Sequence, residues 1–176
     1  MEDVTAAQRF SLRFYLRTLS RLLGNPGHFF DDLPENMGMG LPLGFLMVSS
    51  VIFSAAGLMS AAVGPWVAAA IFMANAVGMV FITSGLGYMV ATLTLGRKAP
   101  YIRFFTIYSF AAGVTLLASW MPYFLLITEP WKWWLIFKGL TCALRMKWQQ
   151  ALMVIGLSIA LIILFFWTLL PLISKS

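Results

Sequence analysis

The chain has 176 residues, of which 61% are apolar and only 10% are charged, and its net charge is +6. A soluble domain has about a quarter of its residues charged, so this composition excludes that class and predicts an all-α, polytopic membrane helix bundle. One histidine, one cysteine and six acidic residues leave little material for acid–base or nucleophilic chemistry, so we expect no enzyme activity, no cofactor and no metal.

Residues 1–40 are predicted to form a cytoplasmic segment with an amphipathic helix and a loop that contains Pro and Phe. The helix covers Thr5–Gly24, and its apolar face holds Leu12, Tyr15, Leu16, Leu19, Leu22 and Leu23. A stripe of arginines runs beside that face at every fourth position, at Arg9, Arg13, Arg17 and Arg21. This pattern suits the headgroup boundary of an anionic leaflet, and the four arginines are the predicted lipid-headgroup contacts. The alternative is a cytoplasmic helix packed on the loops of the bundle.

The loop Asn25–Glu35 follows and holds three of the six acidic residues, Asp31, Asp32 and Glu35. A basic loop later in the chain lies on the same predicted side of the membrane and holds Arg97, Lys98 and Arg103. An ion-pair latch between the two loops is therefore expected. The acids could also join His28 in a metal site, but a solvated acidic turn explains the same residues, so we predict no metal.

Residues 41–173 are predicted to form a five-span membrane domain, because a span needs about 20 apolar residues. The five segments are Leu41–Val63, Trp66–Leu95, Phe104–Ile127, Trp131–Leu144 and Ala151–Ile173. Pro122 interrupts the third, and the fourth is short and carries Lys138. The tryptophans of Glu129–Trp134 indicate a turn at the outer membrane surface between these two spans.

The basic residues set the expected orientation of the five spans. Nine fall on one side: Arg9, Arg13, Arg17, Arg21, Arg97, Lys98, Arg103, Arg145 and Lys147. Only Lys132 and Lys175 fall on the other side, so the N-terminus is predicted in the cytoplasm and the C-terminus outside. Membrane topology thus accounts for the positive charge, and no nucleic-acid partner is expected.

Small residues four positions apart predict places where helices approach closely. They occur at Ala56, Ser60 and Gly64, at Ala74 and Gly78, at Gly87 and Ala91, and at Gly156 and Ala160. Packing within the chain is the favoured interpretation, and a homo-oligomer using the same faces is the alternative. Asn75 and Lys138 are the candidate intramembrane polar site. Asn75 is expected to make an interhelical hydrogen bond, and Lys138 either snorkels to the outer surface past Trp134 or lines a substrate path.

The order of these features resembles the Yip-domain family of five-span membrane proteins over roughly residues 20–172. The resemblance rests on Leu22, Leu23, Pro26, Phe29 and Phe30, on Phe104, Phe105, Tyr108 and Ser109, on Pro122, on Trp134, Lys138 and Gly139, and on Gln149, Gln150 and Ala151. It implies a compact helical bundle with a cytoplasmic N-terminus. Eukaryotic members are tied to Rab GTPases and vesicle traffic. This chain lacks their long polar N-terminal region, which indicates a prokaryotic relative in the bacterial inner membrane.

The predicted function is that of a non-enzymatic, membrane-organising or trafficking-type adaptor whose partners are membrane lipids. One alternative is an accessory subunit of a larger membrane complex. The other is a transporter or lipid-moving protein, which would need polar groups at mid-membrane, where Asn75 and Lys138 stand out.

Overall fold

The computed structural model describes residues 10–58, 64–96, 99–119 and 124–173. Arg9, Ser60, Arg97, Lys98, Pro122 and Lys175, named above, lie outside these ranges. Within them every regular element is a helix, as predicted. The seven helices are α1 (Leu12–Gly24), α2 (Pro26–Asp31), α3 (Gly40–Gly57), α4 (Pro65–Leu95), α5 (Tyr101–Leu116), α6 (Leu125–Cys142) and α7 (Trp148–Ile173).

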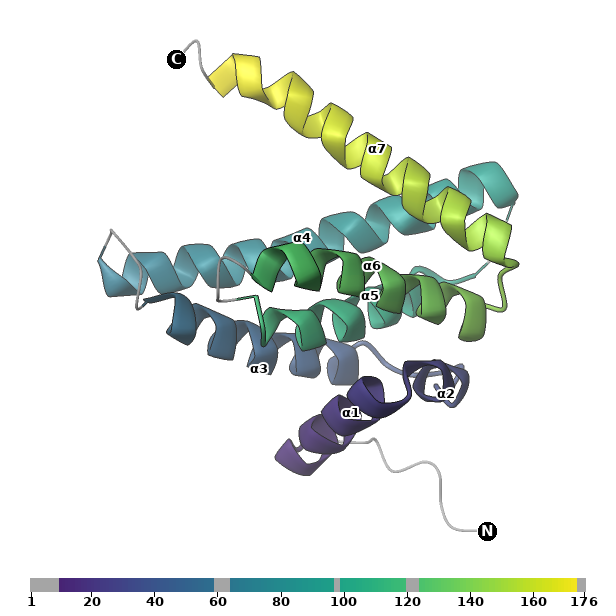
Figure 1. The fold of residues 1–176 in the computed structure, drawn as a ribbon, viewed down its shortest axis with the longest axis horizontal. Helices are drawn as coiled ribbons and strands as arrows, with labels where there is room; N and C mark the ends of the chain where they lie inside the picture. Colours follow the sequence, from purple (N-terminus) through teal and green to yellow (C-terminus); the bar gives the residue numbers. More distant parts are fainter. Residues whose placement is uncertain (1–9, 59–63, 97–98, 120–123, 174–176) are drawn as a thin grey trace.

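Helices α3, α4, α5 and α6 run alongside one another and form the body of the molecule (Figure 1). The connections from α2 to α3, from α4 to α5 and from α6 to α7 lie at one end, which we call the basic end because it holds Arg103, Arg145 and Lys147. At the opposite, far end lie the last turns of α3 and α5 and the first turns of α4 and α6. Helix α7 starts at the basic end beside α6 and leans away from the bundle toward its C-terminus (Figure 1).

Helix α5 is the centre of the bundle. Twelve consecutive residues, 104–115, are buried, so every face of this stretch meets other parts of the chain. Only an apolar helix enclosed by neighbours has this property. Its rings form an aromatic cluster with residues of α2 and α3, in which Phe110 lies 5.2 Å from Phe29 and 5.3 Å from Phe45, measured between ring centroids.

Three helices are long and apolar enough to cross a membrane within the described residues: α3, α4 and the first 18 residues of α7. Helix α5 is apolar but has 16 residues, about 24 Å. Helix α6 has 18 residues but carries Glu129, Lys132 and Lys138. The chain is therefore an all-α protein built to sit in a membrane, and the number of five spans remains a prediction.

The outer turn expected at Glu129–Trp134 is wrong, because this segment is helical. Helix α6 already begins at Leu125 and continues through Pro130 to Cys142. Pro130 has no N–H to donate to the carbonyl of Leu126, which costs one helix hydrogen bond. Burial of the following turn outweighs this cost, since Leu135 and Ile136 are almost completely enclosed against the core.

Glycine contacts test the predicted close approaches between helices. At Gly87 the prediction is confirmed, because an added Cβ would lie 2.5 Å from the Tyr108 hydroxyl of α5. At Gly78 and Gly156 it is wrong for packing against the described part of the chain, where no atom lies within 4 Å of an added Cβ. Gly113 and Gly139 instead provide the close approaches that the spacing pattern did not identify, against Phe45 and Ile107 respectively.

A pair of glycine substitutions tests this packing. Gly139→Ala should destabilise the protein by about 1–3 kcal/mol, because the new methyl group would overlap the branched side chain of Ile107. Gly156→Ala is the matched control and should be neutral or slightly stabilising, since its site is open and Ala favours a helix by about 1 kcal/mol over Gly. Thermal unfolding in one detergent measures both. Equal effects of the two substitutions would contradict the close α5–α6 contact.

Candidate functional site

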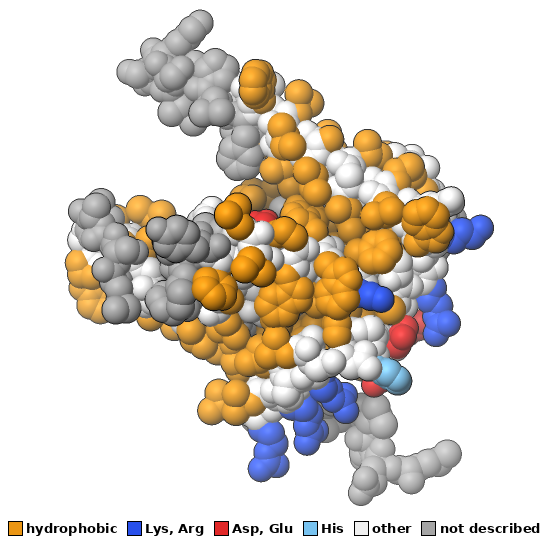
Figure 2. Space-filling view, in the orientation of Figure 1, with side chains coloured by type: hydrophobic (Ala, Val, Ile, Leu, Met, Phe, Trp, Pro, Cys, Tyr) orange, Lys and Arg blue, Asp and Glu red, His pale blue; other side chains and the backbone are white. Residues whose placement is uncertain are grey.

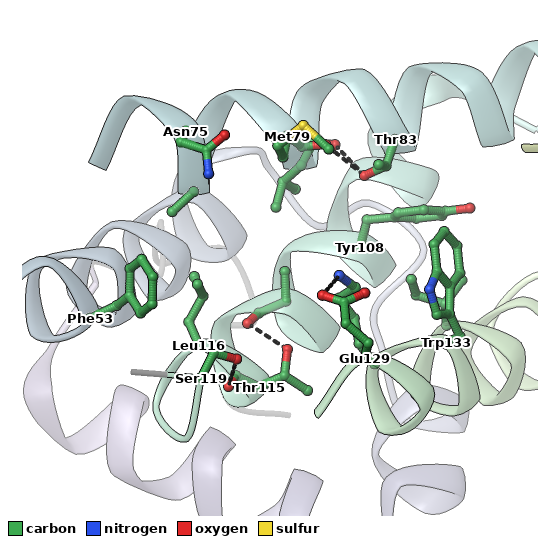
Figure 3. A pocket seen from close by; sticks show the side chains of 15 residues that line it. Phe53, Asn75, Met79, Thr83, Tyr108, Thr115, Leu116, Ser119, Glu129 and Trp133 are labelled. Atoms are coloured by element: carbon green, nitrogen blue, oxygen red, sulfur yellow. Dashed lines mark hydrogen bonds and ion pairs between the residues drawn. The ribbon is translucent and has the colours of Figure 1, made fainter. Parts of the chain in front are cut away.

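A cavity of about 310 Å³ opens between α4, α5 and α6, with Phe53 of α3 at one side. Figure 3 shows Asn75, Met79 and Thr83 reaching into it from α4, and Glu129 and Trp133 from α6. Its walls are mostly apolar, but six polar side chains line it: Asn75, Thr83, Thr115, Ser119, Glu129 and Lys132. A polar cavity of this size has room for a small ligand group or several waters.

The serine and threonine hydroxyl groups of this cavity have hydrogen-bond partners in the protein, and that of Ser119 also donates to the Thr128 hydroxyl of α6 at 3.2 Å. Thr83 donates to the carbonyl of Met79 at 2.7 Å, and Ser119 donates to the carbonyl of Thr115 at 2.7 Å. The Asn75 amide, by contrast, makes no hydrogen bond to any described residue, and its side chain is exposed. The interhelical hydrogen bond expected of Asn75 is therefore not found among those residues, because this side chain faces the cavity.

Glu129 and Lys132 form the charged part of the cavity. The Lys132 Nζ donates to the Glu129 carboxylate at 2.6 Å, and the two side chains are 23% and 51% exposed respectively. The Lys132 Nζ also lies 5.7 Å from the centre of the Trp133 ring. Sequence reasoning missed this pair because it placed both residues in a turn. Their spacing of three positions, which puts two side chains on one face of a helix, was the available signal.

The cavity ends at Tyr108. The ring of this residue lines the cavity, while its hydroxyl is buried against Gly87. One turn earlier on α5, toward the basic end, the rings of Phe104 and Phe105 are enclosed in the core and do not line the cavity. The arrangement is thus a recess in the far half of the bundle that is open at Asn75 and Glu129.

Lys138 lies on α6 outside this cavity. Its Nζ stands 5.8 Å over the ring of Trp134, one turn earlier in the helix. Because α6 begins at Leu125, Lys138 lies about 20 Å along the helix from that end and only four residues from Cys142. To reach the outer surface past Trp134, as predicted, the Lys138 side chain would have to extend over a longer distance than the sequence indicated. The Trp134 ring is a nearer partner for the ammonium group, through a cation–π contact. Asn75 and Lys138 are not brought together.

Helix α1 is fixed to the bundle through its buried face, which holds Tyr15, Thr18 and Leu22. The Tyr15 hydroxyl and the Ser49 hydroxyl are hydrogen-bonded at 3.1 Å, and the Tyr15 ring lies 4.8 Å from that of Phe45. The ring of Phe10 covers Gly44 of α3. The spacing in the sequence predicts Tyr15 and Leu22 on one apolar face with Leu12, Leu16 and Leu23. The structure divides that face, since these last three leucines are exposed.

The arginines of α1 point away from the bundle. Arg13, Arg17 and Arg21 are all exposed, and Figure 2 shows Lys and Arg side chains gathered beneath α1 and at the basic end. The acidic loop lies near the same end. The predicted latch is found there between Glu35 and Arg103, whose charged atoms are 3.8 Å apart. Among the described residues His28 and the nearby acids do not come together as metal ligands.

A bundle with three membrane-length apolar helices defines an integral membrane protein. The Yip1 domain family matches residues 20–170, which is most of the chain, so the protein belongs to the Yip1 domain family. The resemblance seen in the sequence is therefore confirmed. No curated protein and no solved structure matches the chain.

Tyr15→Phe tests the attachment of α1. Losing the hydrogen bond to Ser49 should cost about 1 kcal/mol and raise amide hydrogen exchange in α1 by about fivefold, with little change in α5. Tyr88→Phe is the matched control, because the Tyr88 hydroxyl makes no hydrogen bond to a described residue. If both variants left α1 exchange unchanged, Tyr15 would not hold the helix in place.

Lys138→Met should leave expression and thermal stability nearly unchanged. Methionine is nearly as long as lysine and replaces the cation–π contact with a contact between its sulfur and the Trp134 ring, and removal of the charge also ends the cost of keeping it near the membrane. Lys138→Glu should be tolerated less well, because a shorter acidic side chain loses the cation–π contact. A Lys138→Met protein that folds and inserts but loses its co-purifying lipids would instead assign Lys138 to a headgroup site.

Proposed function

We propose that this protein is a non-enzymatic, membrane-organising or trafficking-type adaptor of the Yip kind in the bacterial inner membrane. Its five spans place the N-terminus in the cytoplasm and the C-terminus outside. The observation that carries this proposal is the geometry of α1. This helix is attached to the bundle by one face and presents Arg13, Arg17 and Arg21 outward on another.

The three sets of side chains on α1 suit a helix at a membrane surface. With about 100° between successive residues, the buried set, the exposed leucines and the arginines point in directions roughly 120° apart. The buried set contacts the bundle. Leu12, Leu16 and Leu23 are then free to enter the acyl region, while the arginines meet anionic headgroups. If α1 were a cytoplasmic helix packed only on the loops of the bundle, its exposed leucines would face water, which is unfavourable.

The distribution of charge supports the proposed orientation. Arg103, Arg145 and Lys147 lie at the basic end, and α1 packs against the half of α3 nearest that end. Cytoplasmic loops are enriched in Lys and Arg, so this end is assigned to the cytoplasm. Helices α5 and α6 serve as the third and fourth spans. The short α5 is enclosed by protein, and two charges of α6 pair inside a cavity.

A role as subunit of a larger complex, or of a homo-oligomer, is the second candidate. It is favoured by α7, which leans away from the bundle and leaves Ile163, Leu164, Phe165 and Trp167 more than half exposed (Figure 1). The open site at Gly156 lies on the same helix. Transport is less well supported, since the cavity ends at Tyr108 instead of crossing the bundle.

Topology reporters test the orientation in cells. A reporter in the 97–98 loop should lie in the cytoplasm, whereas reporters fused at Gly64 and at Ser176 should lie outside, because the basic residues hold the other end inside. A cytoplasmic reporter at Ser176 together with a cytoplasmic N-terminus would require an even number of spans and would contradict the proposed topology.

Substitution of the α1 arginines tests the membrane-surface role. The full-length variant Arg13→Gln/Arg17→Gln/Arg21→Gln should lose most of its preference for anionic over neutral lipids, since each arginine contributes about 1 kcal/mol near such a surface. Lys147→Gln, an exposed cation outside α1, is the control. Lipids and proteins that co-purify in mild detergent are identified together. An unchanged lipid preference with loss of a bound protein would mean that the arginines serve protein contacts.

A further inference from the structure

We propose that the cavity between α4, α5 and α6 binds the headgroup of a phospholipid that carries a primary ammonium group and a phosphate. The acyl chains of that lipid lie in an adjoining groove between α4 and α7. This site is separate from the arginines of α1 and does not depend on the adaptor role.

The ion pair supplies complementary charges for such a headgroup. Lys132 donates one of its three N–H groups to Glu129, so two donors remain for a phosphate. The Glu129 carboxylate keeps free acceptor positions for an ammonium, as its side chain is half exposed. A zwitterionic headgroup can therefore place its ammonium at Glu129 and its phosphate at Lys132. The four charges then alternate in sign, and the ion pair between Glu129 and Lys132 stays intact. The Asn75 amide, which has no partner among the described residues, offers a further acceptor or donor.

The position of the acyl groove identifies the ligand as a lipid. A groove of about 550 Å³ lies between α4 and α7, and its lining is almost wholly apolar, including Ile82, Leu86, Leu161 and Phe165. Met79 lines both the groove and the polar cavity, so the two spaces lie next to each other on either side of this flexible side chain. Along α4 the groove extends from Met79 toward the basic end. A headgroup held near Glu129 at the far end would thus direct its tails toward the middle of the membrane.

The chemistry of the cavity favours a primary over a quaternary ammonium. Quaternary groups are bound by cages of several open aromatic faces. Here the Trp133 ring already has the Lys132 ammonium 5.7 Å from its centre, and the other two rings of the cavity, those of Phe53 and Tyr108, come from two different helices. What the cavity offers a second cation is a carboxylate and an amide oxygen, which accept hydrogen bonds. A primary ammonium donates three hydrogen bonds and a quaternary one donates none. The net charge of the Glu129–Lys132 pair is zero, which suits a zwitterionic lipid better than an anionic one.

Lipid competition on the full-length protein tests the proposal. Native mass spectrometry in detergent compares phosphatidylethanolamine with its N-methyl and N,N-dimethyl derivatives and with phosphatidylcholine, all with the same acyl chains. Binding should fall at each methylation step, and the first lipid should bind about tenfold or more tightly than the last, because hydrogen bonds to a charged group are lost. Equal binding of the four lipids by the unaltered protein would overturn the proposal.

Variants locate the site. Glu129→Gln/Lys132→Met should abolish the dependence on methylation, and Asn75→Leu should weaken it, whereas Lys138→Met should retain it as a matched control on the same helix. Ile82→Trp should fill the groove and weaken the binding of all four lipids without changing their order of affinity. A folded Glu129→Gln/Lys132→Met protein that keeps the preference would overturn the assignment. If that variant fails to fold, Asn75→Leu and the methylation series decide the question.

Discussion

Helix α5 is enclosed by other parts of the chain along twelve of its residues, and the other elements are arranged around it. Such enclosure requires close approach, which Gly139 of α6 provides against Ile107 and Gly87 of α4 provides against Tyr108. Hydrophobic burial does little to hold helices together in lipid, so shape complementarity of this kind is the main source of packing energy. A helix of 16 residues can lie in the middle of a membrane bundle because protein, and not lipid, surrounds it.

The two candidate sites follow from this arrangement. Along the second half of α5, from Tyr108 to Leu116, the space between α4, α5 and α6 is not filled, and the cavity with Glu129 and Lys132 opens there. At the other half of the molecule, the aromatic cluster of α5 extends to Phe45, whose ring contacts Tyr15 of α1. The core thus fixes the direction in which the arginines point. One half of the protein carries a basic surface, and the other carries a recess with a neutral ion pair.

Much of the fold could be predicted from the sequence, because apolar runs and breaking residues are local signals. The C-terminal end of α1, the bounds of α4 to within one residue, the family and the contact between Glu35 and Arg103 follow from the sequence, whereas α1 begins at Leu12 and not at the predicted Thr5. The site could not be predicted in the same way. Whether Gly78 or Gly139 meets a neighbour depends on how α4, α6 and α7 are inclined, which no spacing pattern records. The pairing of Glu129 with Lys132 was hidden because a proline between two charged residues usually indicates a turn.

Hydrogen–deuterium exchange on the full-length protein in lipid nanodiscs tests the central claim most directly, namely that the bundle is built around α5. Amides that open only with the whole fold exchange slowest, and amides of loosely packed elements exchange sooner. The account predicts that residues 104–115 exchange most slowly in the chain and that the second half of α7 exchanges much faster. Exchange in α5 as fast as in the second half of α7 would contradict it.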